Sequence, residues 1–284
     1  MRTLRTVAEL RAALAGPRRA GRTIGLVPTM GAFHEGHLSL MRHARADCDE
    51  TVVSLFVNPT QFDQEADLGA YPRDEARDAA LAAQAGVDLL FAPPLAEVYP
   101  PGFATTVSVA GLTETLEGSH RGHAHFDGVA TVVTKLLNMV MPDVAYFGHK
   151  DAQQALVIER LVRDLDLPVR IEVCPTVREP DGLAMSSRNA RLSASERGRA
   201  TALARALRAA QEAVAAGARD PALARAAALA ELRCAQIEPE YLAFVSPDTL
   251  TPVRALDGDV LAVVAARVGD TRLIDNHLLK DGSA

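Results

Sequence analysis

The sequence predicts an α/β protein in which a parallel sheet is followed by a smaller α+β domain. Over the first 176 residues, short apolar runs alternate with stretches that are apolar at helical spacing, the pattern of βαβ units. Beyond residue 176, two alanine-rich helical stretches precede three strand-like runs, and Gly269-Asp270 between the last two is a hairpin turn signal. We therefore expect two domains, residues 1–176 and 177–284.

The individual elements follow from these runs and from the residues that end them. The first sixteen residues mix Arg and Glu into an apolar pattern, which predicts an amphipathic helix instead of a signal peptide. Proline, alone or after Asn, ends most of the apolar runs. In the first domain we expect strands at 23–27, 51–57, 87–91, 144–147 and 169–173, and helices at 36–46, 73–85, 128–139 and 153–164. In the second we expect helices at 194–216 and 221–235, and strands at 241–245, 260–268 and 271–278.

Composition limits the classes of protein to consider. A hydrophobic content of 48% and a charged content of 23% over 284 residues are typical of a soluble globular protein, and no apolar run is long enough to cross a membrane. The three cysteines lie far apart and lack metal-ligand spacing, which favours a reducing cytoplasm over a disulfide framework. A net charge of −6 argues against a nucleic-acid partner, and we interpret the arginines between 11 and 22 as a solvated helix and loop.

A glycine-containing segment, VPTMGAFHEGH, joins the first predicted strand of the sheet to a helix. Phosphate is favoured at such a helix N-terminus, and ligands of parallel sheets bind beyond the carboxyl ends of the strands. His34 and His37, three residues apart, can meet one ligand, and Gly36 leaves room for a nucleotide. A surface histidine pair is the plain alternative. A zinc site is a weaker alternative, because the spacing of the two histidines does not match a metalloprotease helix and no third ligand is evident.

Other polar residues also follow predicted strands: Asn58, Gln61 and Lys150. We expect them to converge on the same edge of the sheet. Lysine there is a mobile charge suited to phosphate, although it also suits an exposed helix start. The histidines between 120 and 125 suggest a metal, but we favour a solvated loop that covers a ligand.

A second cluster, Met185-Ser186-Ser187-Arg188-Asn189, offers hydroxyls and a guanidinium that suit phosphate oxygens. The alternative is a capping turn. Ser193 with Glu196 already forms a capping box for the next helix, so we expect Ser186 and Ser187 to be available for a ligand.

Six segments occur together in one order: PTMGAFHEGHLSL, FVNPTQF, YPRDEARDAAL, HFDGVATVVTKLLN, FGHKDAQQ and DGLAMSSRN. In them the chain resembles the pantoate–β-alanine ligase family, a branch of the nucleotidyltransferases with the His-x-Gly-His signature. The resemblance implies a Rossmann-like first domain, a smaller second domain that hinges over it, and a homodimer.

It also implies site residues. His37 would be catalytic, Gln61 and Gln154 would hold pantoate, and Gln61 would also lie near β-alanine. Asp78 aligns with an acidic position linked to magnesium, but we assign no residue as a metal ligand. The ATP site implied by the resemblance comprises Met30, Gly31, Ala32, Phe33, His34, Glu35, Gly36, His37, Gly148, His149, Lys150, Asp151, Val177, Met185, Ser186, Ser187 and Arg188.

The reaction implied is a ligation in two steps. In the first step, the carboxylate of pantoate attacks the Mg²⁺ complex of ATP to give pantoyl adenylate and pyrophosphate. In the second, the amine of β-alanine displaces AMP. No serine or cysteine has an obvious base, which suits catalysis by positioning and charge stabilisation. Three alternatives are a transferase that stops at nucleotide transfer, a nucleotide-binding regulator without catalysis, and a tRNA-binding ligase, which the acidic charge disfavours.

Overall fold

The computed structural model of the chain describes residues 1–62 and 65–280. These residues form two compact units. The first comprises Met1–His149 and Gln153–Pro175, and the second comprises Lys150–Ala152 and the chain from Thr176 onward. That the two parts act as separate domains divided at residue 176 stays a prediction.

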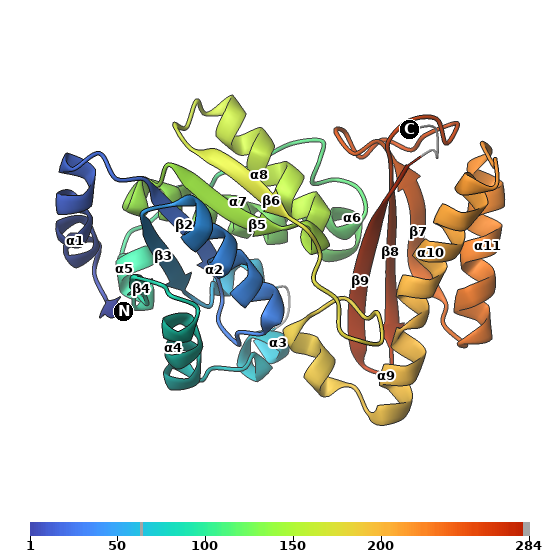
Figure 1. Cartoon of the computed structure of the whole chain (residues 1–284), viewed down its shortest axis with the longest axis horizontal. Helices are drawn as coiled ribbons and strands as arrows, with labels where there is room; N and C mark the ends of the chain where they lie inside the picture. Colours follow the sequence, from blue (N-terminus) through green and yellow to red (C-terminus); the bar gives the residue numbers. More distant parts are fainter. Residues whose placement is uncertain (63–64, 281–284) are drawn as a thin grey trace. The chain divides into compact units, whose positions relative to one another are not determined.

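A six-stranded parallel sheet forms the first unit (Figure 1), in the order β1-β4-β3-β2-β5-β6. When the edge strand β1 is set aside, the chain order of the rest is the 3-2-1-4-5 order of a Rossmann sheet, as expected. The strands are β1 (Arg2–Leu4), β2 (Ile24–Thr29), β3 (Glu50–Leu55), β4 (Leu89–Phe91), β5 (Val144–Gly148) and β6 (Arg170–Cys174).

Successive side chains of the central strands enter two different apolar cores. On β5, for example, Ala145 and Phe147 join the core that includes α1, α7 and α8, whereas Val144 and Tyr146 join the core that includes α2 and α4. Helices therefore cover both faces of the sheet, which explains why its strands are continuous apolar runs. The α-helices of this unit are α1 (Val7–Arg19), α2 (Glu35–Asp47), α3 (Glu65–Ala70), α4 (Glu75–Gln84), α5 (Leu95–Val98), α6 (Glu117–Arg121), α7 (His123–Val140) and α8 (Ala152–Asp164), with 3-10 turns η1 (Pro59–Gln61) and η2 (His149–Asp151).

The start of the chain differs from the expected single helix. Residues Arg2–Leu4 pair in parallel with Leu89–Phe91 of β4 instead. The helix begins only after Thr6, whose side chain accepts a hydrogen bond from Glu9 N (3.1 Å) in a capping box. Hydrogen bonding to a distant sheet edge thus outweighed the helical pattern of residues 1–6.

The second unit holds the antiparallel sheet β7-β8-β9, and its hairpin turns at Gly269-Asp270 as predicted. The expected helix 194–216 is instead two helices, because Thr201 Oγ1 donates to the carbonyl of Gly198 (2.8 Å) and interrupts it. The elements are η3 (Ser187–Arg191), α9 (Ala194–Ala200), α10 (Ala202–Ala215), α11 (Pro221–Cys234), β7 (Pro239–Val245), β8 (Val260–Val268) and β9 (Thr271–Leu279).

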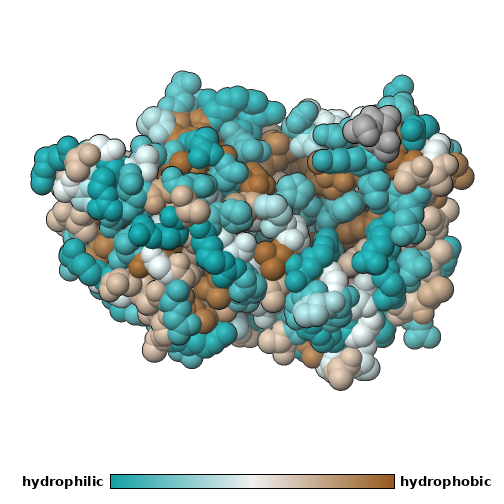
Figure 2. Space-filling view, in the orientation of Figure 1, coloured by the Kyte–Doolittle hydropathy of each residue, from teal (hydrophilic) through white to brown (hydrophobic). Residues whose placement is uncertain are grey.

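Figure 2 shows a face on which hydrophilic residues predominate and apolar residues are scattered in small groups. Of the helices within residues 1–62 and 65–280, none combines the length and the apolar character that a membrane span needs.

Candidate active site

Two neighbouring strands set the position of the candidate site. β2 pairs with β3 on one side and with β5 on the other, so the order of the strands reverses at β2. Segment Met30–His37 follows the carboxyl end of β2, Gly148 ends β5 and His149 follows it. Ligands of open α/β sheets bind at such a switch point. The structure therefore places these two predicted segments at one edge of the sheet.

The paired histidines lie at the N-terminus of α2, a helix of 13 residues. The rings of His34 and His37 lie 4.1 Å apart between centroids. His34 is the N-cap, and its Nδ1 accepts from Gly36 N (3.2 Å). In return, Nδ1 of His37 accepts from His34 N (3.3 Å). In the sequence, Gly36 lies between the two histidines, and it has no side chain, as the motif requires.

These two hydrogen bonds fix the tautomers of both neutral rings. A backbone N–H can only donate, so each Nδ1 is an acceptor and each neutral ring carries its proton on Nε2. Both imidazoles thus present an N–H donor at Nε2, beside the positive end of the helix dipole. That arrangement suits an anion better than a metal ion, which needs an unprotonated nitrogen.

Asp78 holds the segment that precedes the histidines. The residue is 1% exposed, and its two carboxylate oxygens accept from Ala32 N (2.7 Å) and Phe33 N (2.8 Å). Gly31 (φ 86°) and Ala32 (φ 51°) both adopt the left-handed region, and a Cβ atom on Gly31 would lie 2.9 Å from Asp78 Oδ2. The carboxylate therefore stabilises an otherwise unfavourable backbone turn.

Gln61 lies in η1, directly after β3, and its side-chain amide has a fixed orientation. Oε1 accepts from Asn58 Nδ2 (3.1 Å), and Nε2 lies 2.9 Å from the sulfur of Met30. Asn58 is itself fixed, since its Oδ1 accepts from the hydroxyl of Tyr99 (2.9 Å). Burial raises the pKa of Tyr99, so this hydroxyl stays protonated. The structure thus brings a predicted pantoate residue and a predicted ATP residue into contact.

The histidine-rich stretch 120–125 is solvated at His120 and His123, as expected, but it is helical instead of a loop. It spans the end of α6 and the first turn of α7, and these helices meet at Gly122 (φ 81°). His125 is buried at 7% exposure, with Nδ1 2.7 Å from the carbonyl oxygen of Gln61. Apolar packing of α7 in the core of the first unit accompanies the burial of His125, which the local glycine and histidine content could not indicate.

Gly128 lets η1 approach α7 closely, which leads to a prediction. A Cβ atom at this position would lie 2.4 Å from the carbonyl oxygen of Thr60. Gly128→Ala should destabilise the protein by about 1–3 kcal/mol and weaken pantoate binding, because η1 must move away. Gly198→Ala is the matched control: Gly198 is also helical, with nothing within 4 Å of its Cβ position, and should raise Tm slightly. Thermal melts and pantoate KM values check both, and an unchanged Tm in Gly128→Ala would contradict the close packing.

In the second unit, backbone pairing joins the two predicted parts of the ATP site, Val177 and Met185–Arg188. Arg178 pairs with Ala184, and Met185 N donates to the carbonyl of Val177 (3.0 Å). Ser186 caps η3, its Oγ accepting from Arg188 N (3.2 Å), so the capping turn that we gave as the alternative is present at Ser186. The predicted Ser193–Glu196 capping box is present as well. The Ser186 hydroxyl still has its own proton to donate.

The remaining predicted residues lie near the end of β5. Lys150 groups with the second unit, where its carbonyl accepts from Asn276 Nδ2 (2.8 Å), and its Nζ lies 3.6 Å from Asp151. Gln154 is half-buried in the first turn of α8. Its neighbour Gln153 is buried and holds the segment before α6, accepting from Glu117 N (3.0 Å).

The two buried cysteines, Cys48 and Cys174, do not supply a nucleophile. Burial raises the pKa of Cys48, and it raises that of Cys174 to about 11. Both stay thiols near neutral pH, whereas thiolates are the reactive form. Within residues 1–62 and 65–280, no group of three or more His, Cys, Asp or Glu side chains is arranged to hold a metal ion.

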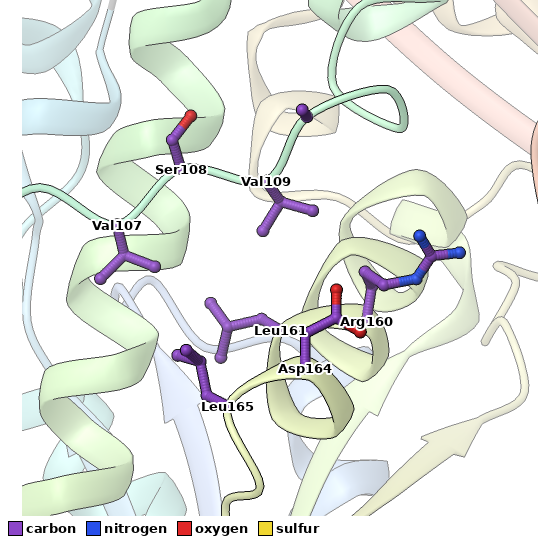
Figure 3. Close-up of a pocket in the computed structure, with 8 residues that line it drawn as sticks. Val107, Ser108, Val109, Arg160, Leu161, Asp164 and Leu165 are labelled. Carbon is purple, nitrogen blue, oxygen red and sulfur yellow. The ribbon is translucent and has the colours of Figure 1, made fainter.

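A pocket of about 240 Å³ lies elsewhere in the first unit (Figure 3). Val107 and Val109 from one segment face Leu161 of α8 and Leu165, which directly follows that helix, with Arg160 and Asp164 of α8 also in the lining. None of the predicted site residues lines it, so we do not assign the site there.

Sequence reasoning noted Asp78 and the histidines of 120–125 but missed that Asp78 and His125 position the site. A buried carboxylate in the first turn of α4 and a histidine in a helix start carry no local signal of their distant partners. It noted that Asn58 follows a strand but gave it no role; Asn58 orients Gln61.

A Rossmann-order sheet with paired histidine donors at its switch point defines a nucleotide-binding α/β protein of the His-x-Gly-His type. A sequence model of the pantoate-β-alanine ligase family matches residues 2–278. The chain belongs to that family.

Related sequences and solved structures agree with this family assignment. The pantothenate synthetase of Cereibacter sphaeroides is 56% identical over 96% of this chain and 98% of its own. That of Moorella thermoacetica is 52% identical over 99% of both. The crystal structure of the Thermus thermophilus pantothenate synthetase has a TM-score of 0.94 at 50% identity, covering 99% of this chain and 100% of that one. A Francisella tularensis pantoate-β-alanine ligase crystallised with β-γ ATP and β-alanine has a TM-score of 0.81 at 32% identity, covering 98% and 97%.

Proposed function

We propose that this protein joins (R)-pantoate to β-alanine at the expense of ATP, giving pantothenate, AMP and pyrophosphate. The observation that carries the proposal is the pair of Nε2–H donors on His34 and His37 at the N-terminus of α2, in a chain that matches the ligase family over residues 2–278. The ATP and β-alanine in the Francisella tularensis structure support both substrates.

In the first step a carboxylate oxygen of pantoate attacks the α-phosphorus of ATP. A phosphorus–oxygen bond forms, the bond to the β-phosphate breaks, and pyrophosphate leaves. His37 and His34 stabilise the charge that develops on the phosphoryl oxygens by donating from Nε2. Gln61 and Gln154 hold pantoate through neutral amides, which bind hydroxyl and carboxylate groups without adding charge.

In the second step the amine of β-alanine attacks the acyl carbon of the adenylate. The carbon–nitrogen bond forms, the carbon–oxygen bond to phosphate breaks, AMP leaves and the amine loses a proton. No covalent bond to the protein is needed, in agreement with the buried thiols. The protein contributes position and charge stabilisation.

The proposal has four further parts. Gly148–Asp151, Val177 and Met185–Arg188 complete the ATP site, with Lys150 and Arg188 adding positive charge. Mg²⁺ enters with the nucleotide, bound mainly by phosphates and water, as is usual for this ion. The chain acts as a homodimer, as the family resemblance implies. It works in the cytoplasm, where thiols stay reduced.

The test is pyrophosphate release from ATP and Mg²⁺, with pantoate alone and with pantoate plus β-alanine. We expect sustained release and AMP only with both substrates, and at most a stoichiometric burst with pantoate alone. Sustained release with pantoate alone would identify a transferase that stops at nucleotide transfer. No release from folded protein would leave only a binding role and overturn the proposal.

A further inference from the structure

The candidate site rests on a hydrogen-bonded chain of residues that is anchored outside it. Arg121 Nη1 lies 3.1 Å from His125 Nε2, and His125 Nδ1 lies 2.7 Å from the carbonyl oxygen of Gln61. All of these residues belong to the first unit. Arg121 ends α6, His125 lies in the first turn of α7 and Gln61 ends η1.

The direction of each hydrogen bond follows from its partners. A guanidinium can only donate, so Nε2 of His125 accepts. The proton of the neutral ring is then on Nδ1, which donates to the Gln61 carbonyl, a group that can only accept. The positive guanidinium and the N-terminus of α7 both disfavour a second positive charge, and His125 is therefore a neutral donor of fixed tautomer.

Gln61 is consequently held at two points. His125 fixes the backbone of Gln61. Asn58 fixes the side chain of Gln61, because Asn58 Nδ2 donates both to Gln61 Oε1 (3.1 Å) and to the carbonyl of Gly128 (3.1 Å). The Gln61 amide therefore directs Nε2, a donor, toward Met30. Loss of the backbone contact would leave Gln61 held mainly through its side chain.

We propose that His125 is a positioning residue for the binding of pantoate, acting through Gln61. The inference rests on the proposed role of Gln61 in holding pantoate. Its ligand is an α,γ-dihydroxy carboxylate, whose oxygens accept from an amide N–H. His125 itself does not contact the substrate.

Two polar substitutions of His125 distinguish the roles of its two ring nitrogens. In His125→Asn the amide nitrogen replaces Nδ1, which preserves the bond to Gln61 and loses that to Arg121. In His125→Gln the amide lies near the position of Nε2, which preserves the contact with Arg121 and loses that to Gln61. We expect His125→Gln to raise the pantoate KM about five- to tenfold, the value of one hydrogen bond, and His125→Asn to raise it less than about twofold. The KM for ATP should stay within about twofold in both.

His123→Gln is the matched control, since His123 is exposed two residues earlier on the same helix and should leave every constant unchanged. Gln61→Ala, alone and combined with His125→Gln, completes a double-mutant cycle. We expect the pantoate effect of His125→Gln to disappear in the Gln61→Ala background. A general packing role would instead change the KM of ATP as well and would persist in that background.

Direct titration of pantoate onto each folded variant gives the same comparison without turnover. Equal effects of the two His125 substitutions, or an undiminished effect of His125→Gln in the Gln61→Ala background, would overturn the inference alone. An unchanged pantoate affinity in Gln61→Ala would overturn both this inference and the assignment of Gln61 on which it rests.

Discussion

His37→Ala is expected to slow adenylate formation by about 100- to 1000-fold, the typical loss when one preorganised donor is removed from a transition state. The Nε2–H of His37 is oriented by the hydrogen bond that its Nδ1 accepts from His34 N (3.3 Å), so a residue elsewhere cannot replace it. Loss of that bond affects a half-buried helix N-terminus and should lower stability by only about 1 kcal/mol. The measurement is single-turnover pyrophosphate release with ATP and pantoate.

Two further variants sharpen this result. His43→Ala on the exposed side of the same helix is the control and should retain the wild-type rate. His37→Gln keeps a neutral amide donor near the position of Nε2, so it should recover part of the lost rate if His37 acts as a fixed hydrogen-bond donor. No recovery would indicate that His37 must transfer a proton, and an unchanged rate in His37→Ala would remove it from the mechanism.

Asp78→Asn is expected to destabilise the protein by about 2–4 kcal/mol and to raise the KM for ATP at least tenfold. Both oxygens of Asp78 accept from backbone N–H groups, at 2.7 and 2.8 Å. An amide has one oxygen, so its NH₂ group must face a donor at a residue that is 1% exposed. The segment from Gly31 to Phe33, which contains two left-handed residues, would then lose one of its two hydrogen bonds to residue 78. Thermal melts and ATP titrations measure the two effects.

The control for Asp78→Asn is Asp74→Asn in the same helix. Asp74 is the exposed N-cap of α4, and asparagine caps a helix about as well as aspartate. The dependence of the rate on free Mg²⁺ gives a separate readout. We expect it to be unchanged in Asp78→Asn, because the carboxylate is committed to the backbone. A large shift in that dependence would make Asp78 a magnesium ligand, and wild-type stability would show that the two hydrogen bonds are dispensable.

The regular elements near the site were predictable because their signals are local. The apolar runs of β2, β3 and β5 and the helical spacing of α2 and α8 identified the elements and placed Met30–His37, Gln61 and Gly148 after strands. Two elements went wrong where distant partners intervened. β1 formed because β4 offered an edge to pair with, and the stretch around His125 became helical because α7 packs on the sheet.

By itself the sequence determined the two-part α/β architecture, the edge of the sheet at which the site residues gather, and membership of the ligase family, since periodicity and motif order are properties of the chain alone. Only the tertiary structure decided how those residues are held. Asp78 meets Phe33 across 45 residues of sequence and His125 meets Gln61 across 64. No local pattern encodes such pairs, because they depend on which segments the fold brings within hydrogen-bonding distance. The contact with Gln61 also decided that Nδ1 of His125 carries its proton.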